Sequence, residues 1–127
     1  MNEGPYLLDT STILWALAAP ERLSVAARRA LKGSLVLSVV SYWEVVVKAR
    51  KGLLAVGNPV EWWSRATELL GGTILSVRAR HISVLSGLPD IHKDPFDRML
   101  IAQANEERLV VLTSDEMVHR YPVKALW

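Results

Sequence analysis

The sequence contains no cysteine, so the 127-residue chain has no disulfide, no thiolate metal ligand and no cysteine nucleophile. This absence is consistent with a reducing cytoplasm. No uninterrupted apolar stretch approaches the roughly 20 residues that span a membrane, and segment 1–5 lacks the basic start and long apolar run of a signal peptide. We therefore expect a soluble, cytoplasmic protein that does not enter a membrane.

The chain also has little excess of positive over negative charge. Lys and Arg total 15 against 13 Asp and Glu, and the net charge of +2 is too small to indicate a nucleic-acid partner by itself. Half of the residues are hydrophobic, so one buried core is feasible without cross-links. The length, and the lack of repeats, low-complexity tracts or linkers, predict a single domain over residues 1–127.

Short apolar runs alternate with helical segments along the chain. We expect strands at 6–8, 35–37, 73–75, 109–112 and 122–126. We expect helices at 11–18, 24–32, 41–51, 59–70, 78–88 and from 95 onward, with a helical turn after Asp115. Continuous apolar strands that alternate with helices indicate an α/β fold, in which a parallel sheet is covered on both faces.

Four acidic residues occupy comparable places in this pattern. Asp9 follows the first strand, and Asp115 follows the strand at 109–112. Glu44 and Asp97 are each expected in the first turn of a helix. Because strand C-termini and the following helix N-termini share one edge of a parallel sheet, we expect all four side chains on the same rim.

Helix capping explains each of these acids equally well when it is taken alone. Ser41 and Glu44 fit a capping box, Asp94 and Asp97 have the same offset, and a cap contributes about 1 kcal/mol. The set differs, since two like charges ~4 Å apart repel by about 4 kcal/mol at an effective dielectric of ~20. A divalent cation relieves this repulsion, because Mg²⁺ and Mn²⁺ prefer oxygen ligands. Such a site can hydrolyse a phosphodiester.

Other polar residues carry weaker patterns. Ser11, Thr113 and Ser114 are placed to orient a water or a phosphate, and N-capping explains each at least as well. No role is assigned to the three histidines, which show no metal-ligand spacing: His81, His92 and His119.

Four segments together resemble the PIN domain family, and specifically its VapC-type toxins. They are Tyr-Leu-Leu-Asp-Thr at 6–10, Leu-Ser-Val-Val-Ser-Tyr-Trp-Glu at 37–44, Asp-Pro-Phe-Asp-Arg-Met-Leu-Ile-Ala-Gln-Ala at 94–104 and Leu-Thr-Ser-Asp at 112–115. Each is modest evidence alone, but all four in this order are specific, and the resemblance covers essentially the whole chain. It implies a three-layer α/β/α sandwich around a central parallel sheet of about five strands.

The resemblance also implies an endoribonuclease that hydrolyses RNA phosphodiester bonds with Mg²⁺, for which Mn²⁺ can substitute. The family's catalytic, metal-binding acids match Asp9, Glu44, Asp97 and Asp115. The family's hydroxyl position before the last acid matches Thr113.

Three neighbouring positions are less clearly assigned. Asp94 is an N-cap or an outer-shell residue, and Arg98 either contacts a phosphate or forms a surface salt bridge. Ser11 stands where the family often has a hydrophobic residue or histidine, which puts only a local substrate contact in doubt.

Partners are implied as well: a homodimer, and a small antitoxin protein that blocks the site of a type II toxin. Five tryptophans are many for a chain of this size. Either a partner surface or the core would accommodate Trp15, Trp62, Trp63 and Trp127.

Two other functions remain open at this point. A Mg²⁺-dependent phosphotransfer or phosphatase enzyme would use Asp9 as its nucleophile, but that chemistry usually needs a second acid two residues later, where this chain has Ser11. A non-catalytic binding module would keep only the fold, and the intact set of four acids argues against it.

Overall fold

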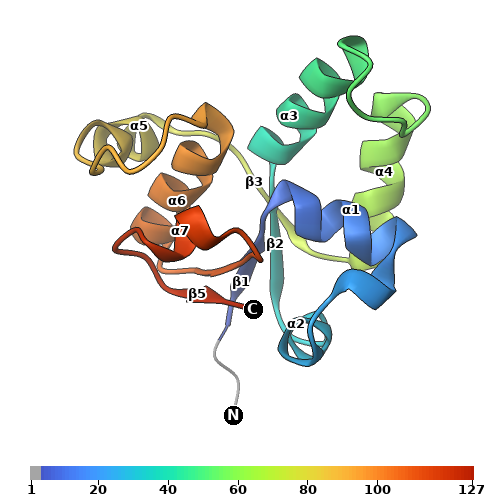
Figure 1. The fold of residues 1–127 in the computed structure, drawn as a ribbon, viewed down its shortest axis with the longest axis horizontal. Helices are drawn as coiled ribbons and strands as arrows, with labels where there is room; N and C mark the ends of the chain where they lie inside the picture. Colours follow the sequence, from blue (N-terminus) through green and yellow to red (C-terminus); the bar gives the residue numbers. More distant parts are fainter. Residues whose placement is uncertain (1–3) are drawn as a thin grey trace.

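Five short strands form one parallel sheet in the computed structural model, which describes residues 4–127 (Figure 1). They are β1 (Tyr6–Leu8), β2 (Leu35–Ser38), β3 (Thr73–Leu75), β4 (Val110–Leu112) and β5 (Ala125–Leu126). Each neighbouring pair in the order β3-β2-β1-β4-β5 is parallel, which confirms the predicted sheet. The first three residues of segment 1–5, discussed above, lie outside the described part of the chain.

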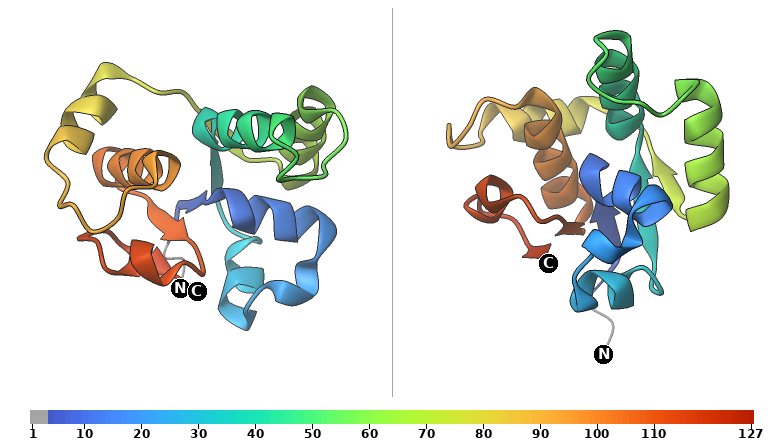
Figure 2. Two further views of the ribbon diagram at one scale, coloured as in Figure 1. Left: turned by 45° about the horizontal axis from the view of Figure 1, so that its top comes forward. Right: turned by 45° about the vertical axis from the view of Figure 1, so that its right-hand side comes forward.

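Helices cover both faces of this sheet. They are α1 (Thr10–Ala18), the 3₁₀ turn η1 (Pro20–Arg22), α2 (Val25–Ala30), α3 (Val39–Arg50), α4 (Pro59–Leu70), α5 (Ala79–Ser86), α6 (Pro95–Glu107) and α7 (Glu116–His119). Helices α5, α6 and α7 lie on one side and α1, α2 and α4 on the other (Figure 1), and α5 lies beside α6 (Figure 2). This is the predicted α/β/α sandwich. Among residues 4–127, no helix is both long and apolar enough to cross a membrane.

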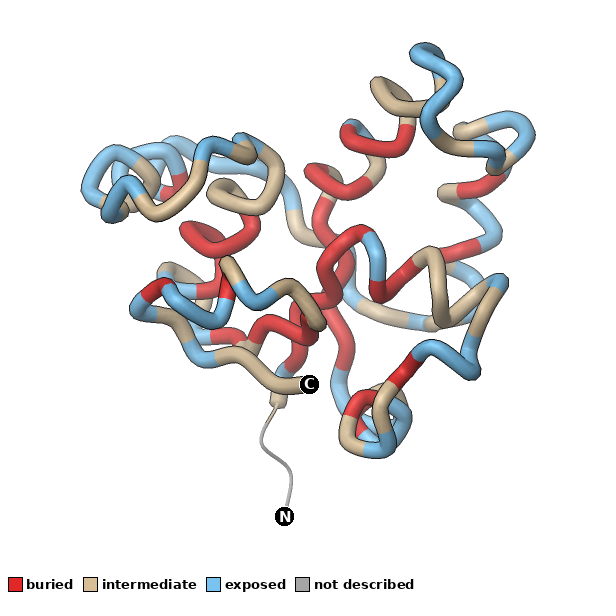
Figure 3. Tube along the Cα trace, in the orientation of Figure 1, coloured by how far each residue is buried: buried red, intermediate tan, exposed pale blue. Residues whose placement is uncertain are grey.

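The core consists of two apolar clusters, one on each face of the sheet. Successive side chains of a strand point to opposite faces. Leu7 accordingly packs with Leu100 and Ile101 of α6, whereas Leu8 packs in the second cluster, which contains Ile13 of α1. Buried residues, red in Figure 3, follow the central strands and the inward sides of the helices.

The direction in which successive strands are added to the sheet reverses beside β1. The chain runs from β1 through β2 to β3 on one side, then returns to β4 and β5 on the other side. In open α/β sheets, ligands bind outside the carboxyl ends of the strands at such a switch point. Asp9 follows β1, and Thr113 to Asp115 follow β4, so these residues lie beside the switch point.

Helix starts lie close to the predicted positions with one exception. The side chains of Ser24, Asn58 and Asp94 each accept a backbone N–H at the start of their helix. The predicted start at Ser41 is wrong, because α3 begins at Val39 and is capped by Ser38, whose Oγ accepts the Val40 N–H at 3.1 Å.

The physical reason is that Ser38 ends β2 and caps α3 at once, so no loop separates strand from helix. The two valines that follow are β-branched and favour strands, so the sequence does not indicate a helix start directly after Ser38. Ser41 is therefore an interior, buried helix residue, and the capping box with Glu44 does not form. Glu44 consequently lies in the second turn of α3, not the first.

Candidate metal centre

One small acidic pocket lies at the carboxyl ends of β1 and β4. Its volume is about 170 Å³. Its walls are formed by Asp9, Thr10, Ser11, Glu44, Lys48, Asp94, Asp97, Ser114 and Asp115. The four acids that were expected on one rim thus share one pocket with a fifth, Asp94, and Lys48 is the only basic residue among those lining it.

Asp9 is one of two buried acids in this pocket. It caps α1 and is 6% exposed. Its Oδ1 accepts the Thr12 N–H at 2.9 Å and the Thr12 hydroxyl at 2.6 Å, and its Oδ2 accepts the Thr113 hydroxyl at 2.6 Å. Burial raises the pKa of Asp9 above its ordinary value, although the bonds from Thr113 and Thr12 oppose that shift. Asp9 is therefore held in one orientation.

Thr113 lies behind the pocket wall, not on it. It is fully buried, and its hydroxyl donates to Asp9 while accepting the Asp115 N–H at 3.0 Å. The hydroxyl therefore bridges the segments after β1 and β4. The other two hydroxyls singled out in the sequence, Ser11 and Ser114, do line the pocket.

Glu44 is buried as well, and both of its oxygens have donors. Oε1 accepts the Thr10 hydroxyl at 2.6 Å, and Oε2 accepts the Lys48 ammonium at 2.5 Å. The Thr10 hydroxyl also lies 3.0 Å from the Ser41 hydroxyl. The bond to Glu44 raises the pKa of Lys48 above its ordinary value.

Asp97 and Asp115 form a more open group. Asp115 caps α7 through Oδ1, which accepts the Met117 N–H at 2.9 Å. Asp97 Oδ2 lies 3.2 Å from His92 Nε2. Each of His92, Asp97 and Asp115 offers one ligand atom within 4.8 Å of the others, a spacing that Asp9 and Glu44 do not share. We call Asp9 and Glu44 the closed half of the pocket, and Asp94, Asp97 and Asp115 the open half.

Electrostatic strain is concentrated in the open half. Burial, followed by the charge of Asp94, raises the pKa of Asp97 to about 7, and Asp115 and Glu44 add to this effect. Asp97 Oδ1 and Asp115 Oδ2 accept no hydrogen bond from residues 4–127. Crowded carboxylates with unfilled oxygens fit a hard divalent cation such as Mg²⁺ or Mn²⁺, which takes oxygen ligands.

Two residues near the acids were not anticipated from the sequence. His92 was assigned no role because the histidines show no metal-ligand spacing, and its approach to Asp97 depends on the path of segment 87–94, which the sequence does not show. Lys48 was not among the candidate residues of the sequence analysis. Its position four residues after Glu44 was the available signal, since such residues are neighbours on one helix face.

Arg98 lies outside the pocket. Its guanidinium donates to the Pro89 carbonyl at 2.7 Å and to the Tyr121 hydroxyl at 2.9 Å. It also pairs weakly with exposed Asp90, at 3.7 Å. Asp94 acts as the cap of α6 and lines the pocket as well.

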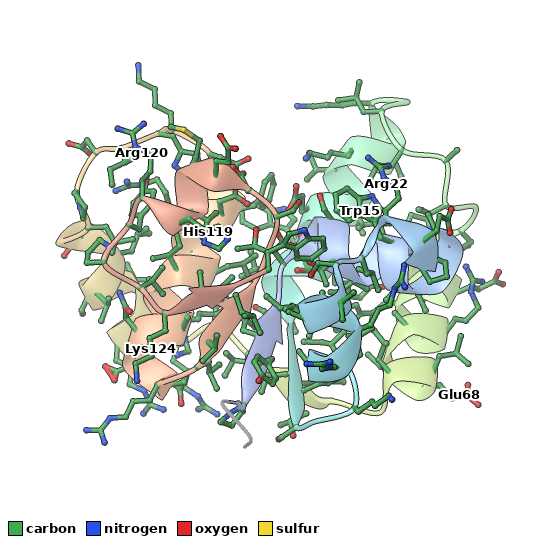
Figure 4. The ribbon with its side chains drawn as sticks, turned by 60° about the horizontal axis from the view of Figure 1, so that its bottom comes forward. Trp15, Arg22, Glu68, His119, Arg120 and Lys124 are labelled. Atoms are coloured by element: carbon green, nitrogen blue, oxygen red, sulfur yellow. The ribbon has the colours of Figure 1, made fainter. Side chains whose placement is uncertain are left out.

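The tryptophans divide between core and surface. Trp62 is buried, and it lines an apolar groove of about 480 Å³ with Trp15, Leu54 and Leu69, which we call the α1–α4 groove. The Arg22 guanidinium lies 4.2 Å from the Trp15 ring centroid (Figure 4). Beyond this groove, Trp15 also meets the Trp127 ring edge-on, at 5.8 Å between centroids.

Trp43 was not among the partner-surface candidates, yet it is 59% exposed. Its ring meets Phe96 edge-on, with centroids 4.9 Å apart. Trp43 precedes Glu44 on α3, and Phe96 precedes Asp97 on α6, so the aromatic contact joins the two helices beside the pocket.

Comparisons with known proteins agree with this architecture. Ribonuclease VapC22 of Mycobacterium tuberculosis is 31% identical over 123 residues, 91% of this chain and 92% of that protein. VapBC2 from Rickettsia felis, bound to a DNA fragment from their promoter, matches 95% of this chain and 96% of its own with a TM-score of 0.71 at 14% identity. A toxin-antitoxin complex from Klebsiella pneumoniae matches 97% of each chain with a TM-score of 0.67 at 18% identity.

The two solved structures support the fold alone, because their sequences are distant. The family assignment rests on sequence: the PIN domain model matches residues 6–124, nearly the whole described chain. Together with the Mycobacterium tuberculosis relative, this match shows that the chain belongs to the PIN domain family.

Proposed function

We propose that this chain is a Mg²⁺-dependent endoribonuclease, with Mn²⁺ able to substitute, and the toxin of a type II toxin–antitoxin pair. It acts in the cytoplasm as a single domain over residues 1–127. The observation that carries the proposal is the acidic pocket, in which five carboxylates from four separate segments face one small space with a single ammonium group.

The charges in this pocket call for a further cation. Lys48 is bonded to Glu44, which leaves Asp9 and the three acids of the open half without a basic partner among the lining residues. Asp97 and Asp115 would hold the cation through their unfilled oxygens, with Asp9 and Glu44 completing the site. A bound divalent cation supplies Lewis acidity, which favours ionisation of water and offsets charge on the phosphate.

The side chains around the acids have separate tasks in this proposal. Ser11 and Ser114 orient the attacking water or a phosphate oxygen, since their residues line the pocket. Thr113 holds Asp9 in place from behind. Lys48 offsets the charge of Glu44 within the wall.

Phosphotransfer through Asp9 is less well supported. A nucleophilic carboxylate needs an accessible oxygen, but Asp9 is 6% exposed and three hydrogen bonds occupy three of the roughly four lone-pair sites of its carboxylate. Ser11 also provides no second acid.

The antitoxin and a homodimer belong to the same proposal. The similar proteins include a toxin-antitoxin complex. On this chain, the apolar α1–α4 groove and exposed Trp43 provide surfaces for protein partners, because tryptophans are enriched at interfaces.

The test uses the purified chain, freed of any partner, with labelled RNA and a DNA strand of the same sequence as control. We expect RNA cleavage with Mg²⁺ or Mn²⁺, loss of cleavage in EDTA, and recovery when excess Mg²⁺ is added. Cleavage that persists in excess EDTA contradicts the proposal. An acyl-phosphate mimic formed on Asp9 by beryllofluoride would favour phosphotransfer instead.

A further inference from the structure

A chain of hydrogen-bonded side chains runs from Arg98 through Tyr121 and His92 to Asp97. The Arg98 guanidinium donates to the Tyr121 hydroxyl at 2.9 Å, this hydroxyl lies 2.7 Å from His92 Nδ1, and His92 Nε2 lies 3.2 Å from Asp97 Oδ2. Arg98 also fastens segment 87–94 through the Pro89 carbonyl, at 2.7 Å. The chain links three separate parts of the molecule.

The bonds around Tyr121 fix which nitrogen of His92 carries the proton. The buried Tyr121 hydroxyl accepts hydrogen bonds from two donors, the Arg98 guanidinium and the backbone N–H of His92 at 3.2 Å. These two bonds fill both lone pairs of its oxygen. Its own proton therefore goes to the nearer acceptor, His92 Nδ1 at 2.7 Å, because the His92 carbonyl is 3.3 Å away. In a neutral imidazole the other nitrogen, Nε2, then carries a hydrogen and donates it to Asp97.

This arrangement decides between two roles for His92. Its nitrogen lies close enough to Asp97 and Asp115 to join them as a metal ligand. A ligating nitrogen must present a lone pair, however, and Nε2 holds its proton as long as the Tyr121 bond persists. The geometry therefore favours a hydrogen-bond donor to a carboxylate over a ligand.

We propose that His92 is a positioning residue that donates its Nε2–H to Asp97 Oδ2 and thereby turns Asp97 Oδ1 toward a bound cation. This inference rests on the proposed metal-dependent function. Tyr121 and Arg98 keep His92 in its donor form, and Asp97 Oδ1 accepts no hydrogen bond within residues 4–127. Partners of this kind orient ligands, and their loss typically weakens metal binding by roughly 10–100-fold.

The experiment measures Mn²⁺ affinity of the full chain by electron paramagnetic resonance, with thermal unfolding as the check on folding. His92→Gln places an amide N–H near the former Nε2, whereas His92→Asn offers the same group but is too short to reach Asp97. We expect His92→Gln to bind Mn²⁺ within about threefold of the wild type. We expect His92→Asn and His92→Leu to bind roughly 10–100-fold more weakly.

A merely structural role for His92 predicts a different pattern. Equal weakening in the Gln and Asn variants, or wild-type affinity in His92→Leu, would overturn the proposal. The Gln and Asn pair still decides the matter if His92→Leu does not fold. Electron spin-echo spectra of the wild type with Mn²⁺ should show no directly bound nitrogen, and a strong ¹⁴N coupling would make His92 a ligand instead.

The wild type separates this inference from the proposed function. If the wild-type chain binds no Mn²⁺, both the metal-dependent nuclease and the role of His92 are wrong. If it binds Mn²⁺ but the His92 variants do not follow the expected order, only the positioning role is wrong.

Discussion

The two halves of the acidic pocket handle negative charge in opposite ways. In the closed half, hydroxyls, a backbone N–H and an ammonium group donate to every carboxylate oxygen of Asp9 and Glu44. In the open half, the caps at Asp94 and Asp115 engage only Oδ1, and Asp97 has a single bond to His92. The closed half is thus stabilised by the protein itself, whereas the open half is where we propose that a cation binds.

The largest expected effect comes from neutralising one acid in each half. Asp97→Asn should reduce RNA cleavage by more than the roughly 10–100-fold that loss of an outer-shell partner costs. Without metal it should be as stable as the wild type or more stable, because burial and neighbouring acids already disfavour the charged form of Asp97. RNA cleavage assays and thermal unfolding in EDTA measure the two effects.

Asp9→Asn is the matched variant in the closed half. This variant should lose activity too, but it should also lose about 1–3 kcal/mol of stability. The reason is that the Asn amide group, itself a donor, replaces a carboxylate oxygen that accepts hydrogen bonds from buried donors. A loss of stability in Asp97→Asn as large as that in Asp9→Asn would contradict the distinction between the halves.

Removing the bridging hydroxyl tests the closed half without touching a charge. Thr113→Val keeps the shape of the side chain but removes the donor to Asp9 and the acceptor for the Asp115 N–H. We expect the free energy of unfolding to fall by about 1–3 kcal/mol, measured by urea unfolding. Ser11→Ala, at an exposed hydroxyl of the same pocket, should stay within about 0.5 kcal/mol of the wild type.

The pH dependence of stability reports on the open half. The pKa of Asp97 is about 7 in the folded chain against an ordinary value of 3.8, so the folded state binds a proton that the unfolded chain releases. The stabilisation of the folded state by protonated Asp97 is complete below pH 3.8 and is lost as the pH rises through about 7.

Metal-free protein should therefore become more stable as the pH falls from about 7.5 to about 5, by at most about 1.4 kcal/mol per pH unit from this group. Urea unfolding in EDTA of the wild type and Asp97→Asn isolates the effect as the difference between their curves. A difference that grows in the opposite direction with pH would show that Asp97 is not the strained acid.

The smallest effect is expected at the Lys48–Glu44 ion pair of the closed half. Lys48→Met removes the ammonium that competes for Glu44, so Mn²⁺ should bind a few-fold more tightly, measured by calorimetry. Stability should change by less than about 1 kcal/mol, because the Lys48 side chain is 37% exposed. Lys51→Met removes an exposed charge one turn farther along, and unchanged Mn²⁺ affinity there would exclude a general charge effect.

Much of the sheet and of the acidic pocket was predictable from the sequence, because strand ends and caps are local features. Asp9, Asp94 and Asp115 each cap the helix that they precede, so their backbone positions follow from short segments. The meeting of distant acids then follows from a parallel sheet.

Contacts that depend on how loops and helix faces meet could not be predicted in the same way. His92 reaches Asp97 only because Tyr121 and Arg98 hold its loop. Thr113 was placed correctly after β4, but the burial of its side chain in the protein interior was not anticipated. Ser38 was missed as a cap because two β-branched valines follow it directly.

The edge-to-face contact of Trp43 with Phe96 has a consequence for the spacing of α3 and α6. Such aromatic pairs contribute about 0.5–1.5 kcal/mol beyond their buried area, and this one joins the residues directly preceding Glu44 and Asp97. An uncharged contact that needs no ion thus helps to hold these helices at their separation. The pocket is pre-organised, so an arriving cation does not have to draw its walls together.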